Sequence, residues 1–158
     1  MFLKKNITLF FLMVMMIFIH TSCGYKKINQ RENNDYQIIK MEIAGDMRIS
    51  DVIKNEISLN SSFDGKEKIR LAINIKKEKN ILNKNIKGKI TKYGLTLNAS
   101  LLLENIESKK IVQRDFIRKM SYDVSKIHSD TLRIEKKYTR TLAENISEDI
   151  VNFINLNF

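Results

Sequence analysis

The strongest constraint on the fold is a stretch near the middle of the chain in which apolar side chains occupy every second position. Its apolar members are Tyr93, Leu95, Leu97, Ala99, Leu101 and Leu103. Successive side chains of a β-strand point to opposite faces, so this period of two indicates a strand with one buried and one wet face. The chain must therefore build a sheet and cover one side of it.

Two earlier stretches show the same alternation. In the first, Ile39, Met41 and Ile43 alternate with polar residues, and Gly45 ends the run. The other carries its apolar residues at Ile69, Leu71, Ile73 and Ile75. Each stretch predicts a half-buried strand.

A fourth strand is predicted from Ile111 to Tyr122, paired back on the third through a turn at 105–109. Its pattern is irregular, because Arg114 and Arg118 share the parity of the apolar Phe116. Either a β-bulge resets the faces of the strand, or two cations point to the apolar side. We favour the bulge.

Two segments have the spacing of amphipathic helices. Ile49, Val52, Ile53 and Ile57 fall on one helical face. A second face, in a helix from about residue 130 to 155, carries Leu142, Ile146, Ile150, Phe153 and Ile154. Asp46 is expected to cap the first helix, and Ser129 or Asp130 the second.

The predicted order is therefore strand, helix, three strands, helix. Such a chain forms an α+β fold in which two helices pack on one face of a four-stranded, mainly antiparallel sheet. We expect its core to include Ile53, Leu71, Ile73, Leu95, Leu97, Leu101, Leu142, Ile146 and Ile150.

The N-terminus has the order of an export signal. Lys4 and Lys5 precede an apolar run over residues 7–19, which is shorter than the roughly 20 residues that a membrane-spanning helix needs. Thr21 and Ser22 then lead to Cys23, the single cysteine of the chain, in a stretch that resembles the lipobox of bacterial lipoproteins. His20 stands where that motif usually has leucine.

This resemblance implies cleavage before Cys23 and acylation of that residue, whereas the alternative is a free thiol at the chain start. A lone cysteine has no partner for an internal disulfide, which favours acylation. We therefore predict a signal peptide at 1–22, a lipidated start and tether at 23–34, and one domain at 35–158.

Composition makes the mature chain basic. The whole chain has 28 Lys and Arg against 18 Asp and Glu, a net charge of +10, and the signal removes two lysines. An excess of cations favours phosphate-bearing partners, and export argues against nucleic acid. Equally open is a compositional origin, because a genome rich in A and T favours Lys, Asn and Ile codons.

Residues for catalysis are scarce. His128 is the one histidine after the signal, and we interpret its neighbours Ser125, Ser129 and Asp130 as a capping loop ahead of the last helix. Zinc sites need clusters of Cys or His, and Gly88-Lys89 lacks the rest of a phosphate-binding loop. We expect neither an enzyme nor a metal site, and no cofactor apart from the lipid on Cys23.

Several stretches resemble the LptE family of lipopolysaccharide-assembly lipoproteins, in its alphaproteobacterial form. They are CGYK at the predicted mature start, IAGDMRISDVIKNEI, KITKYGLTLNASLLLENIESKKIV, MSYDVSKIHSDTL and TLAENISEDIVNFI. The resemblance implies a lipid-anchored protein on the periplasmic side of the outer membrane. It also implies that the domain plugs the β-barrel LptD and contacts lipopolysaccharide.

Lipid A carries phosphates, which lysine and arginine bind through charge-assisted hydrogen bonds. One candidate group lies in the expected turn after the second strand and contains Lys76, Lys77, Lys79 and Lys84. A second lies on the fourth strand and contains Arg114, Arg118 and Lys119. The alternative is ordinary surface charge on a solvated hairpin, in a structural lipoprotein that serves another envelope machine without a lipid ligand.

Overall fold

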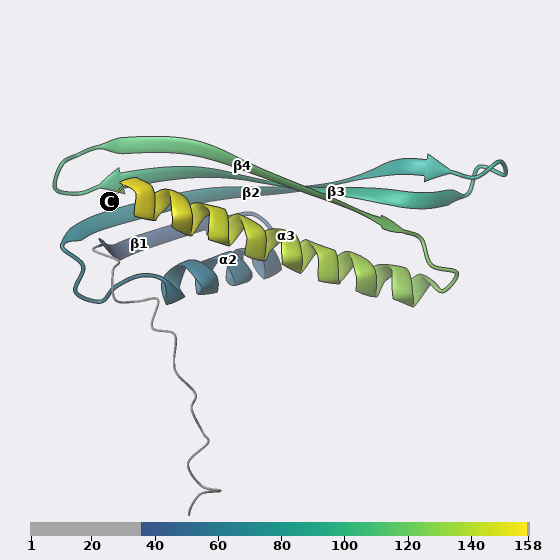
Figure 1. The fold of residues 1–158 in the computed structure, drawn as a ribbon, viewed down its shortest axis with the longest axis horizontal. Helices are drawn as coiled ribbons and strands as arrows, with labels where there is room; N and C mark the ends of the chain where they lie inside the picture. The colour runs from purple at the N-terminus through teal and green to yellow at the C-terminus, as the bar shows by residue number, and fades with distance from the viewer. Residues whose placement is uncertain (1–35, 158) are drawn as a thin grey trace, which may run out of the picture. The chain divides into compact units, whose positions relative to one another are not determined.

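The computed structural model describes residues 36–157 (Figure 1). The predicted signal peptide, Cys23 and the predicted tether lie outside the described residues. The elements are β1 (Tyr36–Ala44), α2 (Met47–Leu59), β2 (Glu67–Lys84), β3 (Ile90–Asn105), β4 (Ile111–Asp123) and α3 (His128–Asn157). This order is the predicted one, and the predicted α+β fold class is confirmed.

The four strands form one mixed sheet in the order β1-β2-β3-β4. Strands β2, β3 and β4 pair antiparallel through two hairpins, whereas β1 pairs parallel to β2. Two parallel neighbours need a crossover connection, and α2 provides it. Both helices lie on the same side of the sheet (Figure 1).

The core lies between the sheet and the helices. All nine predicted core residues are buried, including Leu97 at the centre of β3 and Ile146 on the facing side of α3. Asp46 caps α2 as predicted, because its carboxylate accepts hydrogen bonds from the backbone N–H groups of Arg48 and Ile49 at 3.0 and 3.3 Å. The period of the apolar residues in the sequence was thus sufficient to predict the core, and the capping chemistry of Asp46 was sufficient to predict the start of α2.

The alternation predicted for β1 is wrong at one position. The register with β2 shifts between Ile38 and Lys40, so the extra residue, Ile39, turns outward and is half-exposed. Tyr36 takes the buried position at the start of the strand, and its hydroxyl donates to the carbonyl of Asn60 at 3.2 Å. Burial raises the pKa of Tyr36 to about 12.

The bulge predicted for β4 is also wrong. Pairing with β3 runs without a shift from Lys92↔Asp123 to Glu104↔Ile111. Arg114 and Arg118 therefore do face the helix side, in the same row as Phe116. Since β4 is an edge strand, cations in this row extend past the core to the rim of the sheet and find partners on α3.

The last helix begins earlier than predicted. His128 is its first residue, so this histidine does not lie in a loop, and Ser129 and Asp130 lie inside the first turn. A different contact fixes this end, because the hydroxyl of Thr131 accepts from the backbone N–H of Ser125 at 3.0 Å. Thr131 is buried, and its hydroxyl was not recognised as a link to the preceding segment.

Candidate functional site: the cations of the sheet

The first group of candidate lysines lies in a strand and not in a turn. β2 continues to Lys84, and the turn itself comprises residues 85–89. The apolar alternation stops after Ile75, which is why the sequence suggested a loop, but backbone pairing with β3 carries the strand onward. The alternation of side chains then separates neighbouring lysines to opposite faces.

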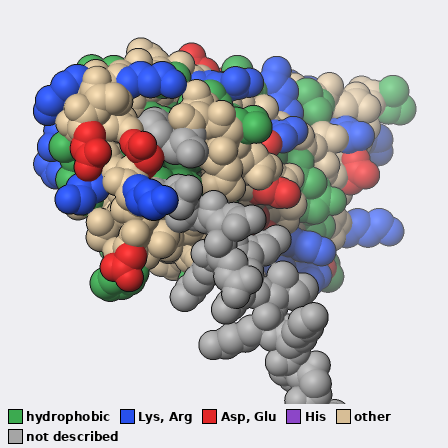
Figure 2. All heavy atoms as spheres, turned by 60° about the vertical axis from the view of Figure 1, so that its left-hand side comes forward, with side chains coloured by type: hydrophobic (Ala, Val, Ile, Leu, Met, Phe, Trp, Pro, Cys, Tyr) green, Lys and Arg blue, Asp and Glu red, His purple; other side chains and the backbone are tan. Residues whose placement is uncertain are grey.

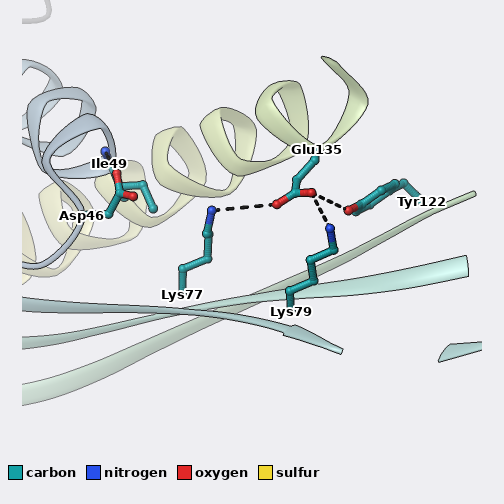
Figure 3. A network of polar contacts seen from close by, with 6 residues as sticks. All are labelled: Asp46, Ile49, Lys77, Lys79, Tyr122 and Glu135. Carbon is teal, nitrogen blue, oxygen red and sulfur yellow. Dashed lines mark hydrogen bonds and ion pairs between the residues drawn. The ribbon is translucent and has the colours of Figure 1, made fainter. Parts of the chain in front are cut away.

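Lys77 and Lys79 point to the helix side and meet Glu135 of α3 (Figure 3). The Nζ of Lys79 donates to Oε2 of Glu135 at 2.6 Å, and the Nζ of Lys77 lies 4.0 Å from Oε1. The hydroxyl of Tyr122 on β4 donates to the same Oε2 at 2.9 Å. Three elements are thus joined at one carboxylate, whose side chain is 17% exposed.

The electrostatics of this cluster favour the ion pair. Burial raises the pKa of Glu135, but hydrogen bonds from Lys79 and Tyr122 outweigh it, and the net shift is downward. For Lys79, burial lowers the pKa, and the hydrogen bonds that Lys79 makes with Glu135 and Tyr122 reverse the shift to a net increase. Burial is also the main reason that the pKa of Tyr122 is raised. At neutral pH the cluster therefore holds an ammonium, a carboxylate and a protonated phenol.

Lys79 also lies over an aromatic ring. Its Nζ is 4.1 Å from the ring centroid of Tyr93 on β3, which is within the range of a cation–π contact. The ammonium group of Lys79 thus has two partners within its own domain, Glu135 and Tyr93, although its side chain is still 34% exposed. A phosphate at this position would compete with the carboxylate of Glu135.

The second group of candidates is similarly divided. Arg118 binds Asp149 of α3 with two hydrogen bonds, Nε to Oδ2 at 2.7 Å and an Nη to Oδ1 at 2.5 Å. The hydrogen bond to Asp149 raises the pKa of Arg118. The guanidinium carbon of Arg114 lies 5.1 Å from the ring centroid of Phe153. Both arginines therefore help to attach α3 to the edge of the sheet.

Lys76 and Lys119 lie on the opposite, outer face of the sheet. The Nζ of Lys76 is 2.8 Å from a carboxylate oxygen of Glu78 on the same strand. Lys119 pairs in register with Thr96, and Thr96 pairs with Glu78, so these residues form a row across three strands. The hydrogen bond and charge of Lys76 lower the pKa of Glu78, with a smaller contribution from Lys119.

The seven candidates therefore do not form one site. Four face the helices, Lys76 and Lys119 face outward, and Lys84 lies at the far end of β2. In the view of Figure 2, Lys and Arg side chains are spread over the visible surface and do not gather in one patch. Charge in this domain is distributed, and most of the predicted phosphate ligands already have internal partners.

The end of the β2–β3 hairpin, which we call the distal hairpin and define as residues 79–93, was not predicted as one surface from the sequence. It carries Lys87, Lys89 and Lys92 besides Lys79 and Lys84. It also exposes Ile81, Leu82 and Ile86. The feature of the sequence that indicates this surface is a long interval without acidic residues, because no Asp or Glu occurs between Glu78 and Glu104.

A groove between the two helices was also missed. It has a volume of about 360 Å³ and is lined by apolar side chains such as Ile49, Val52 and Leu132, with Lys77 and Glu135 at its edge. The hydroxyl oxygen of Thr139 is buried there and has no hydrogen-bond partner among residues 36–157. Figure 3 shows Ile49 of α2 and the capping residue Asp46 on the same side of the sheet as Lys77.

Two further observations apply to residues 36–157. No three of their His, Cys, Asp and Glu side chains come close enough together to hold a metal ion. Neither of the helices in this range has the length and apolar character needed to span a membrane.

Comparison with known proteins gives a fold and no family. No protein-family model and no curated protein sequence matches the chain. Among solved structures, the rare lipoprotein B from Shewanella oneidensis aligns with a TM-score of 0.58 and 11% identity, over 75% of this chain and 95% of that one. A minor lipoprotein from Acinetobacter baumannii aligns with a TM-score of 0.55 and 18% identity, over 77% and 94%.

A third similar structure is a putative lipoprotein from Caulobacter crescentus, with a TM-score of 0.51 and 8% identity, over 78% of this chain and 89% of that one. Identities this low establish a shared fold and nothing about ligands. The domain therefore has the fold of several bacterial lipoproteins, and it matches almost their whole length.

Proposed function

We propose that this protein is an outer-membrane lipoprotein that partners an LptD-type β-barrel in the transport and assembly of lipopolysaccharide. Cys23 would carry the lipid and hold the domain on the periplasmic side of the membrane. The observation that carries the proposal is the fold, shared with lipoproteins over nearly their full length, in a chain that begins with a lipobox-like stretch. The sequence resemblance to the LptE family supports a role in the transport and assembly of lipopolysaccharide.

The architecture suits a plug. The helices cover one face of the sheet, and the other face presents polar and charged side chains such as Asn74, Thr96 and Arg70, with Leu102 and Ile117 exposed among them. Large outer-membrane barrels have polar lumens, which suit the polar part of this face. The role we propose is one of binding, not catalysis.

The structure also revises which cations we expect to meet lipid A phosphates. Lys77, Lys79 and Arg118 already bind carboxylates of α3, so a phosphate would have to replace an existing ion pair. Lys84 and Lys119 have no carboxylate within ion-pair distance among the described residues. We therefore propose these two as the better candidates.

Mild detergent extraction tests the proposed partner. The lipidated protein, carrying a C-terminal tag, is purified from its own membranes and the proteins that remain bound are identified. We expect a very large β-barrel protein in stoichiometric amount. Recovery of peptidoglycan or of a different envelope complex, with no such barrel, would overturn the proposal.

One observation favours a second candidate function, that of a structural lipoprotein without a lipid ligand. Ion pairs with carboxylates of α3 already involve Lys77, Lys79 and Arg118, so these cations contribute to the fold without an external ligand. Binding of lipopolysaccharide to the purified protein separates the two roles. No binding in about 0.15 M salt, where contacts between exposed charges are screened beyond roughly 8 Å, would favour the structural role.

A further inference from the structure

The distal hairpin has a charge of a single sign. Within it and onward to Leu103 the chain contains five lysines and no acidic residue. Lys84, Lys87 and Lys89 surround the turn and are exposed. Elsewhere on the sheet several lysines lie beside carboxylates, such as Lys40 beside Glu42 and Lys76 beside Glu78. The end of the hairpin is thus a cationic surface without local compensation.

The same end of the hairpin exposes large apolar side chains. Ile81 and Leu82 are 49% and 50% exposed, and Ile86 is fully exposed at the turn. Ile81 pairs in register with Tyr93, and Leu82 follows it where the pairing with β3 shifts, so both present apolar surface at this end of the hairpin. Neither helix covers this part of the hairpin, which projects from one end of the sheet (Figure 1).

The turn that presents Ile86 is held rigidly. The side-chain oxygen of Asn85 accepts from the backbone N–H groups of Lys87 and Lys89 at 3.0 and 2.9 Å. Two backbone hydrogen bonds close the turn, from Asn85 to Lys89 and from Gly88 to Asn85, and Gly88 has a positive φ of 74°. The backbone at Ile86 is therefore held in place before any partner arrives, so little backbone entropy is lost on binding.

We infer that the distal hairpin inserts its tip into the interfacial region of a bilayer that contains anionic phospholipids. The surface of such a bilayer has an apolar acyl boundary beneath a layer of anionic headgroups. The apolar side chains at the tip match the acyl boundary, and the lysines around the tip match the headgroups. Isoleucine and leucine would enter the acyl boundary, while the ammonium groups stay with the phosphates. Lysine suits this arrangement, because its long stem lets the charge reach the headgroups while the tip is buried.

This inference goes beyond the proposed function and does not depend on it. It concerns the phospholipid of a bilayer and not lipopolysaccharide or a protein partner. For a domain anchored by lipid at its N-terminus, the hairpin would provide a second, reversible attachment to the membrane. The second attachment would set how the domain is oriented on its membrane.

The protein has no tryptophan, so a single introduced one reports on its own position. We would place it at the tip with Ile86→Trp in the full lipidated protein and reconstitute it into vesicles of phosphatidylcholine or of phosphatidylcholine with phosphatidylglycerol. We expect a blue shift of emission and quenching by brominated acyl chains only in the anionic vesicles. The lipid anchor is present in both, so the difference isolates the hairpin.

Ile127→Trp provides the matched control, because Ile127 is exposed in the loop before α3 and lies outside the hairpin. Its emission should not depend on phosphatidylglycerol. Adding Lys84→Glu and Lys87→Glu to the Ile86→Trp protein should abolish the blue shift while circular dichroism confirms the fold. Equal emission of Ile86→Trp in both vesicles, or a shift that survives charge reversal, would overturn the inference.

The test is separate from that of the proposed function. A protein that recovers a large β-barrel but shows no insertion of Ile86→Trp would contradict only the hairpin inference. A protein that inserts its tip but recovers no barrel would contradict only the proposed partner. Both results are obtained with the same lipidated chain.

Discussion

Glu135 on α3 and Lys79 on β2 are 56 positions apart in the chain, yet their charged atoms lie 2.6 Å from each other. Tyr122 donates to the same carboxylate oxygen, so the contact joins the longest helix to two strands. On β2 it lies beyond the last buried apolar residue, Ile75, although Leu95 of β3, which is opposite Lys79, is still buried. A polar cluster thus continues the attachment of α3 to β2 where the apolar residues of that strand stop.

Glu135→Gln should lower the free energy of unfolding by about 1 to 2 kcal/mol, because it removes a partly buried, charge-assisted contact and leaves Lys79 without its carboxylate. The matched control is Glu144→Gln, which breaks the exposed pair between Glu144 and Arg140 one helical turn apart. That change should stay within about 0.5 kcal/mol. Urea denaturation of both variants measures the difference, and equal effects would contradict a special role for Glu135.

The same carboxylate should make stability depend on pH. The folded state lowers the pKa of Glu135, so its contribution is fully present above the pKa of the unfolded chain, near 4.3 for an ordinary glutamate. The contribution is lost as pH falls through the lower, folded value. Unfolding of the wild type and Glu135→Gln should therefore differ most near neutral pH and converge in acid. A constant difference down to pH 3 would show that Glu135 does not titrate as described.

A substitution in the hydrophobic core should lower the free energy of unfolding more than Glu135→Gln does. Leu97 is fully buried at the centre of β3, and Leu97→Ala should cost about 2 to 5 kcal/mol by loss of apolar contact and creation of a cavity. Leu102→Ala is the control on the same strand, because Leu102 faces outward and is substantially exposed. Chemical denaturation should separate the two variants clearly. Similar midpoints would mean that the two faces of β3 are not distinguished as the structure has them.

Local pattern was enough to predict this core and the α+β order. The apolar alternation of β3 and the helical spacing of Ile53 and Ile57 can be recognised from residues that are neighbours in the sequence. The sheet can then bury its apolar face only beneath the apolar faces of the two helices. The errors share another cause. Arg118 could be placed on the apolar side only because Asp149, far away in the chain, receives it at the rim of the sheet. The sequence does not show that Asp149 lies next to Arg118, so a β-bulge was preferred over a cation on the apolar side.

The candidate site was predicted less well for the same reason. Neighbours in the lysine run, such as Lys76 and Lys77, separate to opposite faces once β2 is extended, and Lys77 then meets Glu135. Charge alone does not reveal which cations have partners, because the partners come from distant elements. The distal hairpin could have been noticed, since a long interval without acidic residues is visible in the sequence.

Acylation of Cys23 remains a prediction, with a direct test. Mass spectrometry of the protein purified from its own membranes should find an N-terminus at Cys23 that carries three acyl chains. Cys23→Ser should leave an unprocessed precursor or a soluble form, because serine has no thiol to take the diacylglyceryl group. A cleaved chain with an unmodified thiol would contradict the lipoprotein assignment.

The last prediction concerns lipopolysaccharide, and it rests on the separation of paired from unpaired cations. Lys84 is exposed at the end of β2 and lies within the hairpin that contains no acidic residue. If it meets a lipid A phosphate, Lys84→Glu should weaken binding of lipopolysaccharide and make the remaining binding less sensitive to salt. Fold stability should hardly change, since exposed substitutions usually stay within about 0.5 kcal/mol.

Lys54→Glu changes the net charge by the same amount on the exposed face of α2 and controls for overall attraction. Its binding should match the wild type when measured in about 0.15 M salt, where charges farther than roughly 8 Å are largely screened. Equal weakening by both variants would show that net charge, not a contact at Lys84, holds the ligand. Wild-type binding by Lys84→Glu would move the phosphate contact to Lys119, which, unlike Arg114 with its contact to Phe153, has neither an ion pair nor a cation–π contact among the described residues.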